Sequence, residues 1–300
     1  MKTDNETKQG VIFALLAYIM WGLVPLYFKQ LHQVPAYEIL AHRAIWSCVL
    51  LVILLCLFKL WPKVWAVLQV PRNVLLLVCT ATLISINWLT YIWAVNNDHL
   101  LDASLGYFIN PIINVALGMV FLSEKLRKLQ WLAIGLAVTG VLVQIITLGY
   151  LPWIALVLSC SFGLYGLLRK KLHLNALVGL LIETVIMLPI AALYLFVLAD
   201  SATSDLSNNP VTLNLFLLCA AFITTVPLLC FNNAAIRLPL STLGFFQYIG
   251  PTIIFILGVA LYGETVKTEM LITFIFIWAA LVVFTFDGVR QRQYRAPKLK

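Results

Sequence analysis

The chain has 300 residues, of which 62% are hydrophobic and 11% are charged, and its mean hydropathy is +0.98. Soluble globular domains contain about 45–50% apolar and about 25% charged residues, so a soluble enzyme, a disordered chain and a secreted disulfide scaffold are excluded. The net charge of +8 does not indicate nucleic-acid binding, because the Lys and Arg residues lie in short runs between apolar segments. The composition is that of a polytopic membrane protein.

Ten apolar segments are long enough to cross a membrane as helices. Spanning a hydrocarbon core about 30 Å thick takes about 20 predominantly apolar residues. The first segment is expected to be retained as a helix, because acidic residues precede it and no small-residue cleavage site follows it. In chain order, the predicted spans are residues 10–28, 36–58, 73–95, 103–122, 129–147, 151–168, 175–198, 211–231, 241–262 and 268–286.

The positions of the basic residues predict how the chain crosses the membrane. Of the 20 Lys and Arg residues, Lys29 and Lys267 lie in loops on one side and Arg43 lies within a span. The remaining 17 lie at the amino terminus, in the alternate loops or in the tail. Loops rich in Lys and Arg stay in the cytoplasm. Both termini are therefore predicted to be cytoplasmic, as is the basic run 169–171 after the sixth span.

An internal repeat links the fourth and ninth spans. Pro111, Gly118 and Glu124 follow one another at spacings of seven and six residues, and the same residue types recur 140 residues later. The first and sixth spans also match, at an offset of 141 residues. Two independent matches at nearly one offset indicate a duplicated unit of five spans. The second copy of the motif consists of Pro251, Gly258 and Glu264.

The predicted architecture is an all-α membrane protein with ten transmembrane helices in two inverted five-helix repeats. An odd number of spans per unit inverts the second unit relative to the first. Inverted repeats are a recurring construction of secondary transporters, whose halves expose a central site to each side in turn. The predicted units are residues 9–147 and 150–287, and a basic cytoplasmic tail follows at residues 288–300.

Four stretches of the sequence carry a family resemblance: residues 18–29 (YIMWGLVPLYFK), 38–43 (EILAHR), 87–88 (NW) and 106–111 (GYFINP). Together with the two Pro-Gly-Glu motifs, they resemble the RarD branch of the drug/metabolite transporter superfamily, whose members have two EamA-type repeats. The resemblance covers nearly the whole chain. It implies a permease of the bacterial inner membrane, of the kind labelled chloramphenicol-sensitive, that exports a small organic metabolite or a drug-like solute.

Soluble-enzyme motifs are missing from the sequence. It has no GxxxxGK[ST] phosphate loop, no HExxH or other metal-ligand spacing, and no nucleophile elbow. We therefore expect no catalytic residue, no metal site and no cofactor, and we expect an ion gradient or the substrate's own gradient to drive transport. A membrane-embedded enzyme and a non-transporting scaffold remain as alternatives. The expected partners are a small-molecule substrate and the lipid bilayer, without nucleic acid, and the oligomeric state is left open.

Ionisable residues inside spans are costly, which makes Glu38, His42, Arg43 and Glu183 functional candidates. Glu38, His42 and Arg43 lie towards the outer end of the second span, and Glu38 and His42, four residues apart, share a helix face. Either this group fixes the helix at the outer surface, or Arg43 pairs with a substrate carboxylate or an acidic partner. Glu183 lies about 12 Å from the inner end of the seventh span. Glu183 either exchanges a proton or has a structural role. In the structural role, it is protonated or paired with Arg43.

Amide and aromatic residues are expected to line a central cavity between the first, third and fourth spans and their repeat mates. Pro111 lacks an amide proton and should bend the fourth span, leaving a free carbonyl between Asn110 and Asn114. The alternative is that the Asn and Gln side chains join helices by hydrogen bonds. The candidate substrate-binding residues are Trp21, Asn87, Trp88, Tyr91, Tyr107, Asn110, Asn114, Gln247 and Tyr248.

Two acidic residues of the repeated motif, Glu124 and Glu264, lie at span ends. The amino end of a helix carries a partial positive charge that favours a carboxylate. We expect each of these residues to bond to the amino end of the helix that follows it.

Overall fold

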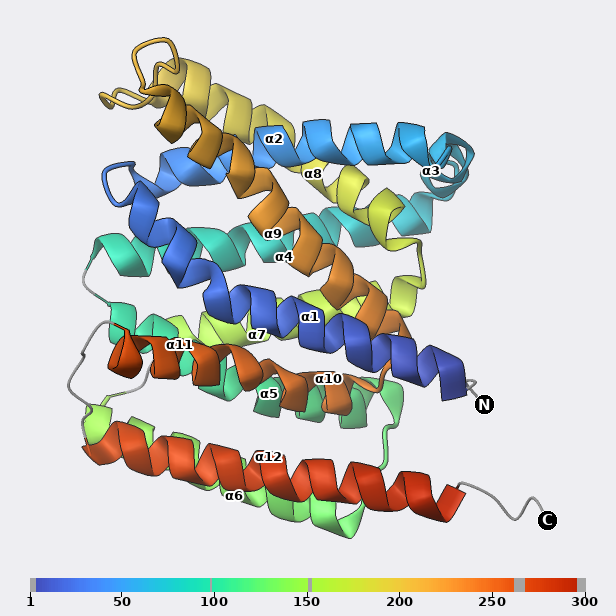
Figure 1. Cartoon of the computed structure of the whole chain (residues 1–300). Helices are drawn as coiled ribbons and strands as arrows, with labels where there is room; N and C mark the ends of the chain where they lie inside the picture. The colour runs from blue at the N-terminus through green and yellow to red at the C-terminus, as the bar shows by residue number, and fades with distance from the viewer. Residues whose placement is uncertain (1–3, 98, 151–152, 262–267, 296–300) are drawn as a thin grey trace.

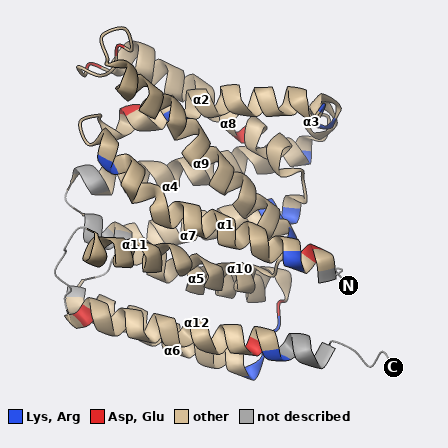
Figure 2. Cartoon of the chain, in the orientation of Figure 1, with Lys and Arg blue, Asp and Glu red and all other residues tan. Residues whose placement is uncertain are grey.

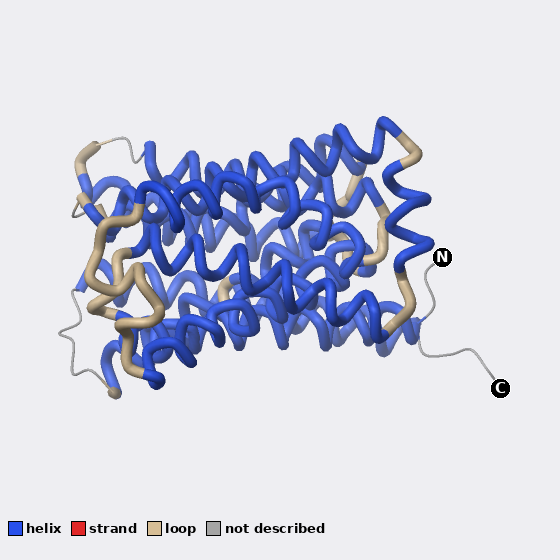
Figure 3. Tube along the Cα trace, turned by 90° about the horizontal axis from the view of Figure 1, so that it is seen from above, coloured by secondary structure: helices blue, strands red, loops and turns tan. Residues whose placement is uncertain are grey.

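The structure, a computed structural model, describes residues 4–97, 99–150, 153–261 and 268–295. Helices account for most of this part of the chain, and no strand occurs among the residues described. Ten of its helical segments are long and apolar enough to cross a membrane, and each coincides with one of the predicted spans. The predicted all-α membrane fold is confirmed. Seen from above, the helices run side by side and the loops gather at the two ends of the bundle (Figure 3).

The first half of the chain contains five spanning helices and two short ones. The short helices are the 3-10 turn η1 (Lys29–Leu31) and α3 (Trp61–Leu68). Pro62 lies in the first turn of α3, where its missing amide proton costs nothing. The spanning helices are α1 (Asp4–Phe28), α2 (Ala36–Leu57), α4 (Pro71–Asn96), α5 (Leu100–Leu122) and α6 (Lys128–Leu148).

The second half is less regular. Its seventh span continues from an α-helix into one π-helical segment, and its ninth span is built from two helices. The elements are α7 (Trp153–Leu172), α8 (Ala176–Leu193), the π-helix η2 (Tyr194–Leu198), α9 (Val211–Arg237), α10 (Leu240–Gln247), α11 (Ile249–Ala260) and α12 (Thr268–Arg295).

The break in the ninth span falls at Tyr248, between α10 and α11. Pro251 explains its position, because proline has no amide proton to bond to the carbonyl of Gln247 and its ring crowds that carbonyl. Tyr248 instead closes a tighter turn, its amide donating to the Phe245 carbonyl at 3.3 Å. The equivalent Pro111 lies within α5, which continues through it without a break. The two repeat-related prolines therefore have different local effects.

Both described ends of the chain lie at the same end of the bundle, on the right of Figure 1. Most Lys and Arg residues gather at that end (Figure 2). Lys29 directly follows α1, at the end of that helix opposite to the amino terminus. This arrangement agrees with the alternation of loops inferred from the sequence. Lys267, Glu264 and residues 296–300 of the tail lie outside the described residues.

The outward surface of the bundle is apolar. Val120, Ile190 and Phe196 are 73%, 74% and 78% exposed. Side chains of this kind are stable on a surface only where lipid replaces water. The chain is therefore a multi-pass membrane protein.

Candidate functional site

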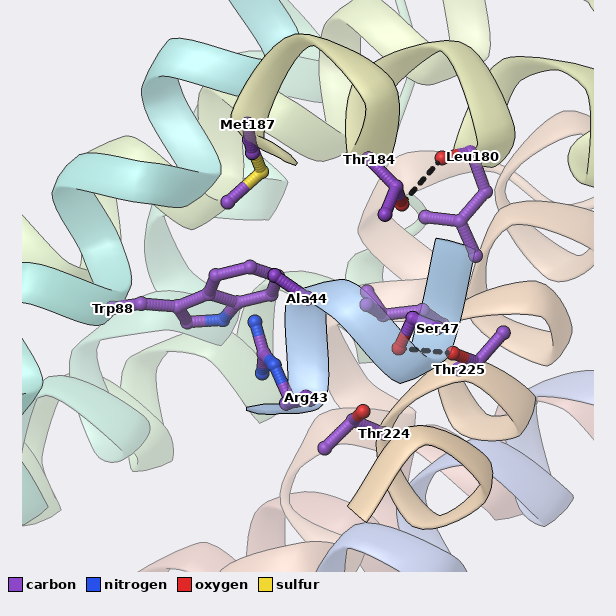
Figure 4. Close-up of a pocket in the computed structure, with 10 residues that line it drawn as sticks. Arg43, Ala44, Ser47, Trp88, Leu180, Thr184, Met187, Thr224 and Thr225 are labelled. Carbon is purple, nitrogen blue, oxygen red and sulfur yellow. Dashed lines mark hydrogen bonds between the residues drawn. The ribbon is translucent and has the colours of Figure 1, made fainter. Parts of the chain in front are cut away.

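A cavity lies inside the bundle between α2, α4, α8 and α9 (Figure 4). Its enclosed space is small in this conformation, about 20 Å³, which is room for about one water molecule, so the helices must move apart before it can hold an organic ligand. Thr224, one of its lining residues, is the middle residue of the 27-residue helix α9, so the cavity lies near mid-membrane. The lining residues are Arg43, Ala44, Ser47, Trp88, Leu180, Thr184, Met187, Thr224, Thr225 and Leu228.

This cavity lies elsewhere in the bundle than the substrate cavity expected from the sequence. The second, third, seventh and eighth spans enclose it, rather than the first, third and fourth spans with their mates. Of the nine proposed substrate-binding residues, Trp88 alone lines it, and Arg43 is the one candidate charge that does so. Hydropathy locates a span but does not specify which spans pack together, so the sequence could not place the cavity.

Arg43 contributes the charge of the cavity. Its guanidinium carbon lies 3.1 Å from the centroid of the Trp88 ring, an arrangement in which the negative face of the indole attracts the cation. Figure 4 shows the two side chains facing each other beside the cavity. The Nη2 atom of Arg43 is buried and has no hydrogen-bond partner among the described residues. A buried cation with open donors is a ready anion site.

Three hydroxyl groups around the cavity have their own acceptors. Thr184 Oγ1 donates to the Leu180 carbonyl at 2.7 Å, four residues back on α8. Thr224 Oγ1 likewise donates to the Ala220 carbonyl at 2.7 Å, four residues back on α9. Thr225 Oγ1 donates to Ser47 Oγ at 2.8 Å. No described residue accepts a hydrogen bond from Ser47 in return. Arg43 and Ser47, four residues apart on α2, therefore present unused donors on one helix face.

Glu38, the nearest carboxylate along α2, is engaged elsewhere. It is fully buried, and its carboxylate accepts hydrogen bonds from Ser201 and from Thr203 Oγ1, the latter at 2.7 Å. These contacts fix the segment between η2 and α9 against the start of α2. His42 is 1% exposed, and neither ring nitrogen has a hydrogen-bond partner in the described part of the chain. Glu38 therefore does not neutralise Arg43.

Glu183 lies at the centre of a second, closed polar cluster. Its carboxylate accepts a hydrogen bond from Thr80 Oγ1 at 2.6 Å, from the Tyr165 hydroxyl at 3.3 Å and from Arg169 Nη1 at 3.4 Å. The Tyr165 hydroxyl is also within hydrogen-bond distance of Asn232. Four helices, α4, α7, α8 and α9, meet at this cluster. Arg169, not Arg43, is the ion-pair partner of Glu183, which corrects the pairing considered from the sequence.

Arg169 was the residue that sequence reasoning missed. The predicted sixth span ended at residue 168, which placed Arg169 in a basic cytoplasmic loop, whereas α7 continues to Leu172 and Arg169 is 3% exposed. A Cβ atom on Gly179 would lie 1.9 Å from Arg169 Nη1. A glycine four residues before a buried acid is the signal in the sequence that indicates room for a large partner.

Several predicted cavity residues join helices instead. Asn87 Nδ2 donates to the Leu158 carbonyl at 2.8 Å and to Ser161 Oγ at 3.0 Å, linking α4 to α7. Asn114 Nδ2 donates to Gln247 Oε1 at 3.1 Å, linking α5 to α10. These contacts match the alternative stated for the amide side chains. Their direct contribution to binding stays a prediction.

The remaining candidates lie away from the cavity. The Tyr248 hydroxyl donates to the Phe108 carbonyl at 3.1 Å. Asn110 is 4% exposed, and its Oδ1 atom has no donor among the described residues. Trp21 packs in an aromatic cluster with Tyr18, Phe162 and Phe231, and the rings of Tyr91 and Tyr107 are 6.4 Å apart.

Glu124 caps a helix, but not the one that follows it in the chain. Glu124 Oε1 accepts from the Leu240 amide at 2.6 Å, and Oε2 accepts from the Ser241 amide at 2.9 Å and from its hydroxyl at 2.6 Å. The carboxylate therefore caps α10, in the other half of the chain, because the end of α5 lies against the start of α10. The expectation that it would cap α6 was wrong. Glu264 lies outside the described residues.

Comparisons with known proteins place this architecture in a family. The EamA-like transporter family matches residues 8–146. Protein RarD of Escherichia coli is 54% identical over 285 residues, which cover 95% of this chain and 96% of that protein. The chain belongs to the EamA-like transporter family. An uncharacterized transporter of Vibrio cholerae is 54% identical over 96% of this chain and 95% of its own.

More distant similarity extends over the same length. The chloramphenicol-sensitive protein RarD of Pseudomonas aeruginosa is 29% identical to this EamA-like chain over 286 residues, covering 94% of this chain and 95% of that protein. A solved crystal structure matches with a TM-score of 0.71 at 15% identity, covering 92% of this chain and 97% of the other. That match supports the fold alone. The family description is that of a transporter and fits the absence of enzyme motifs from the sequence.

Proposed function

We propose that the chain is a secondary transporter that carries a small organic solute through the cavity between α2, α4, α8 and α9 by alternating access. The observation that carries the proposal is the position of Arg43, a cation with open donors beside a cavity near mid-membrane. Ionisable residues at this depth are costly and are found where substrates or ions pass. The proposed direction is outward across the bacterial inner membrane, with both termini in the cytoplasm.

The pattern of helix packing supports an alternating mechanism. Under the proposed repeat, α1, α2, α4, α5 and α6 correspond to α7, α8, α9, α10–α11 and α12. The helices α1 and α9 pack together, and so do their mates α7 and α4; α5 packs on α7, as α11 packs on α1. The pairs α2–α8, α5–α10 and α6–α12 join mates directly. Exchanging the two halves thus preserves these pairs, although α7 also packs on α9 without an equivalent contact between α1 and α4 among the described residues. The shared pairs support two related halves that rearrange against each other.

The cluster around Glu183 is the proposed site of energy coupling. Glu183 is 1% exposed and directly precedes Thr184, which lines the cavity. Carboxylates buried in membrane helices belong to proton relays in many pumps and transporters. Movement of α8 against α7 would change the 3.4 Å contact with Arg169. Such a change would let Glu183 take up a proton on one side and release it on the other.

Transport by purified, reconstituted protein tests the proposal. Proteoliposomes would be incubated with an isotope-labelled extract of bacterial metabolites and with labelled chloramphenicol, and the solutes that cross would be identified by mass spectrometry. Thr224→Trp should abolish the accumulation of every transported solute, because the indole fills the cavity. Thr82→Trp is the matched control, since Thr82 makes the same hydroxyl contact to a carbonyl one turn back but lies exposed on α4. Equal transport by the two variants would exclude this cavity as the pathway.

The proposed orientation has its own test. In whole cells, a membrane-impermeant thiol reagent should label Asp205→Cys, which lies between η2 and α9, and should not label Lys171→Cys until the cells are opened. The expected pattern follows from the clustering of basic residues at the end of the bundle that holds both termini. Labelling of Lys171→Cys in intact cells would show that the chain has the opposite orientation, with its basic loops outside the cytoplasm.

A further inference from the structure

The charge balance of the cavity points to the class of solute that fits it. In the printed sequence, Glu38 and Glu183 are the only acidic residues on α2, α4, α8 and α9. Glu38 is bonded to Ser201 and Thr203, and Glu183 is paired with Arg169. Neither carboxylate forms an ion pair with Arg43, which therefore contributes one positive charge to the cavity without a direct acidic partner.

The open donors have the arrangement that a carboxylate uses. Arg43 Nη2 is buried without an acceptor, and Ser47 accepts from Thr225 while its own proton has no acceptor among the described residues. A guanidinium offers donors in a planar fork that matches the two oxygens of a carboxylate. The hydroxyl group of Ser47 could donate a further hydrogen bond to one of the ligand's carboxylate oxygens. The Trp88 ring packs on the guanidinium of Arg43 and accepts no hydrogen bond from it, so these donors stay available to a ligand.

The rest of the lining consists of threonines and apolar residues and contains no second charge. Ala44, Leu180, Met187 and Leu228 form a hydrophobic wall, in which the methionine can adapt to the shape of a ligand. An ammonium group would find no carboxylate in this lining, and it would be repelled by Arg43. A dianion such as a phosphate monoester would bring a second negative charge that nothing in the cavity neutralises.

We propose that the solute is a monoanionic carboxylate with an apolar body, held by Arg43 and Ser47, and that zwitterionic amino acids and neutral compounds are disfavoured. This inference rests on the proposed function, because it assumes that the cavity binds the transported solute. It assigns Arg43 and Ser47 to the carboxylate, and Leu180, Met187 and Leu228 to the apolar body. One cation and one anion leave the occupied cavity electrically neutral at mid-membrane.

Three probes that differ in one group test the assignment. Binding of 3-phenylpropionate, phenylalanine and 3-phenylpropanamide to the purified full-length protein would be measured by calorimetry. Phenylalanine adds an ammonium group to the first probe, and the amide removes its charge. We expect 3-phenylpropionate to bind at least about tenfold more tightly than either of the others, since hydrogen bonds to charged groups are worth at least that factor.

Variants of Arg43 connect the preference to the residue. Arg43→Gln should lower the affinity for 3-phenylpropionate by at least about tenfold and abolish the preference, whereas Arg43→Lys should retain part of it, because the charge remains without the fork. Arg237→Gln is the matched control, since Arg237 ends α9 and bonds to Asn233 on its own helix. Thermal unfolding of each variant would verify that it is folded.

The outcomes separate this inference from the proposed function. If the amide or phenylalanine binds as tightly as 3-phenylpropionate, if 3-phenylpropionate does not bind, or if Arg43→Gln leaves its affinity unchanged, the assignment of a carboxylate is overturned. Loss of transport in Thr224→Trp would then still support the cavity as the pathway. If Thr224→Trp also transports normally, the proposed pathway fails together with the inference.

Discussion

Arg43 and Glu183, which correspond under the proposed repeat, carry opposite charges. The two residues are 140 positions apart, and each is the eighth residue of its helix, α2 or α8. Glu183 is surrounded by donors, with Thr80, Tyr165 and Arg169 on its carboxylate. Arg43 packs against the face of the Trp88 ring and lines a cavity. One half therefore closes its buried charge within the protein, and the other leaves it open.

The difference indicates that the two buried charges have different roles. A buried charge whose partners are all protein groups contributes to one arrangement of helices, and losing a partner is costly. A buried charge with unused donors gains stability when a ligand supplies the missing partner. The closed cluster should therefore control stability and coupling, and the open charge should control binding. The following predictions test this comparison, beginning with the largest expected effect.

Removing the acid of the closed cluster should destabilise the protein most. Glu183→Ala leaves Arg169 as an uncompensated buried cation, which typically costs about 3–5 kcal/mol. The free energy of unfolding would be measured by denaturant titration in detergent micelles. Combining Glu183→Ala with Arg169→Ala should recover much of the loss, because the orphaned charge is then gone. Additive losses would show that the 3.4 Å contact between the two side chains carries no coupling energy.

Glu183→Gln should separate coupling from binding. Glutamine keeps the size and the acceptor of the side chain, so the bond from Thr80 can persist, but it does not titrate. The loss of stability should be smaller than for alanine. In proteoliposomes, uptake driven by a pH gradient should be abolished, whereas exchange of solute across the membrane should continue. A variant that still responds to the pH gradient would make Glu183 purely structural.

Two asparagines on α5 extend the comparison to neutral groups. Asn114→Ala should cost about 1–3 kcal/mol, because Gln247 loses its buried partner. Asn110→Ala should cost less, since the Oδ1 atom of Asn110 has no donor to lose among the described residues. The two residues are one helical turn apart and both nearly buried, so each is the control for the other in thermal unfolding. Equal losses would mean that the Gln247 contact is without consequence.

Arg43→Gln should change stability least. The guanidinium makes no ion pair in the described part of the chain, and the loss of its contact with Trp88, worth about 0.5–2 kcal/mol, is offset by removal of a buried charge. The net change in the free energy of unfolding should therefore stay within about 1 kcal/mol. A loss as large as that of Glu183→Ala would show that Arg43 is structural and would remove the contrast between the two halves.

The sequence predicted the spans well and their partners poorly. Apolar length alone identifies ten membrane helices, because a bilayer imposes the same requirement on each of them. Arg169 was misassigned because Lys170 and Lys171 follow it, and a count of basic residues does not detect one further helical turn. Pro251 alone does not predict the break at Tyr248, because the proline in the matching position, Pro111, leaves α5 continuous.

The site was harder to predict than the fold. Arg43, Trp88 and Glu183 were recognised as unusual residues, but their neighbours were not. Which donor faces Glu183 depends on how α7 packs on α4 and α9, and this packing is set by the shapes of many apolar side chains together. The threonine hydroxyl groups around Arg43 come from α8 and α9, in the other half of the chain, and threonines of this kind are common elsewhere in apolar spans.

The cap that Glu124 places on α10 has a consequence for biosynthesis. The amides of Leu240 and Ser241 find their acceptor on a residue made more than a hundred positions earlier. The first amides of a helix need such a partner wherever water is scarce. As the ribosome releases α10, the end of α5 must already be in place beside it. A second half expressed as a separate polypeptide would begin this helix without its acceptor, and co-expression of the first half should restore it.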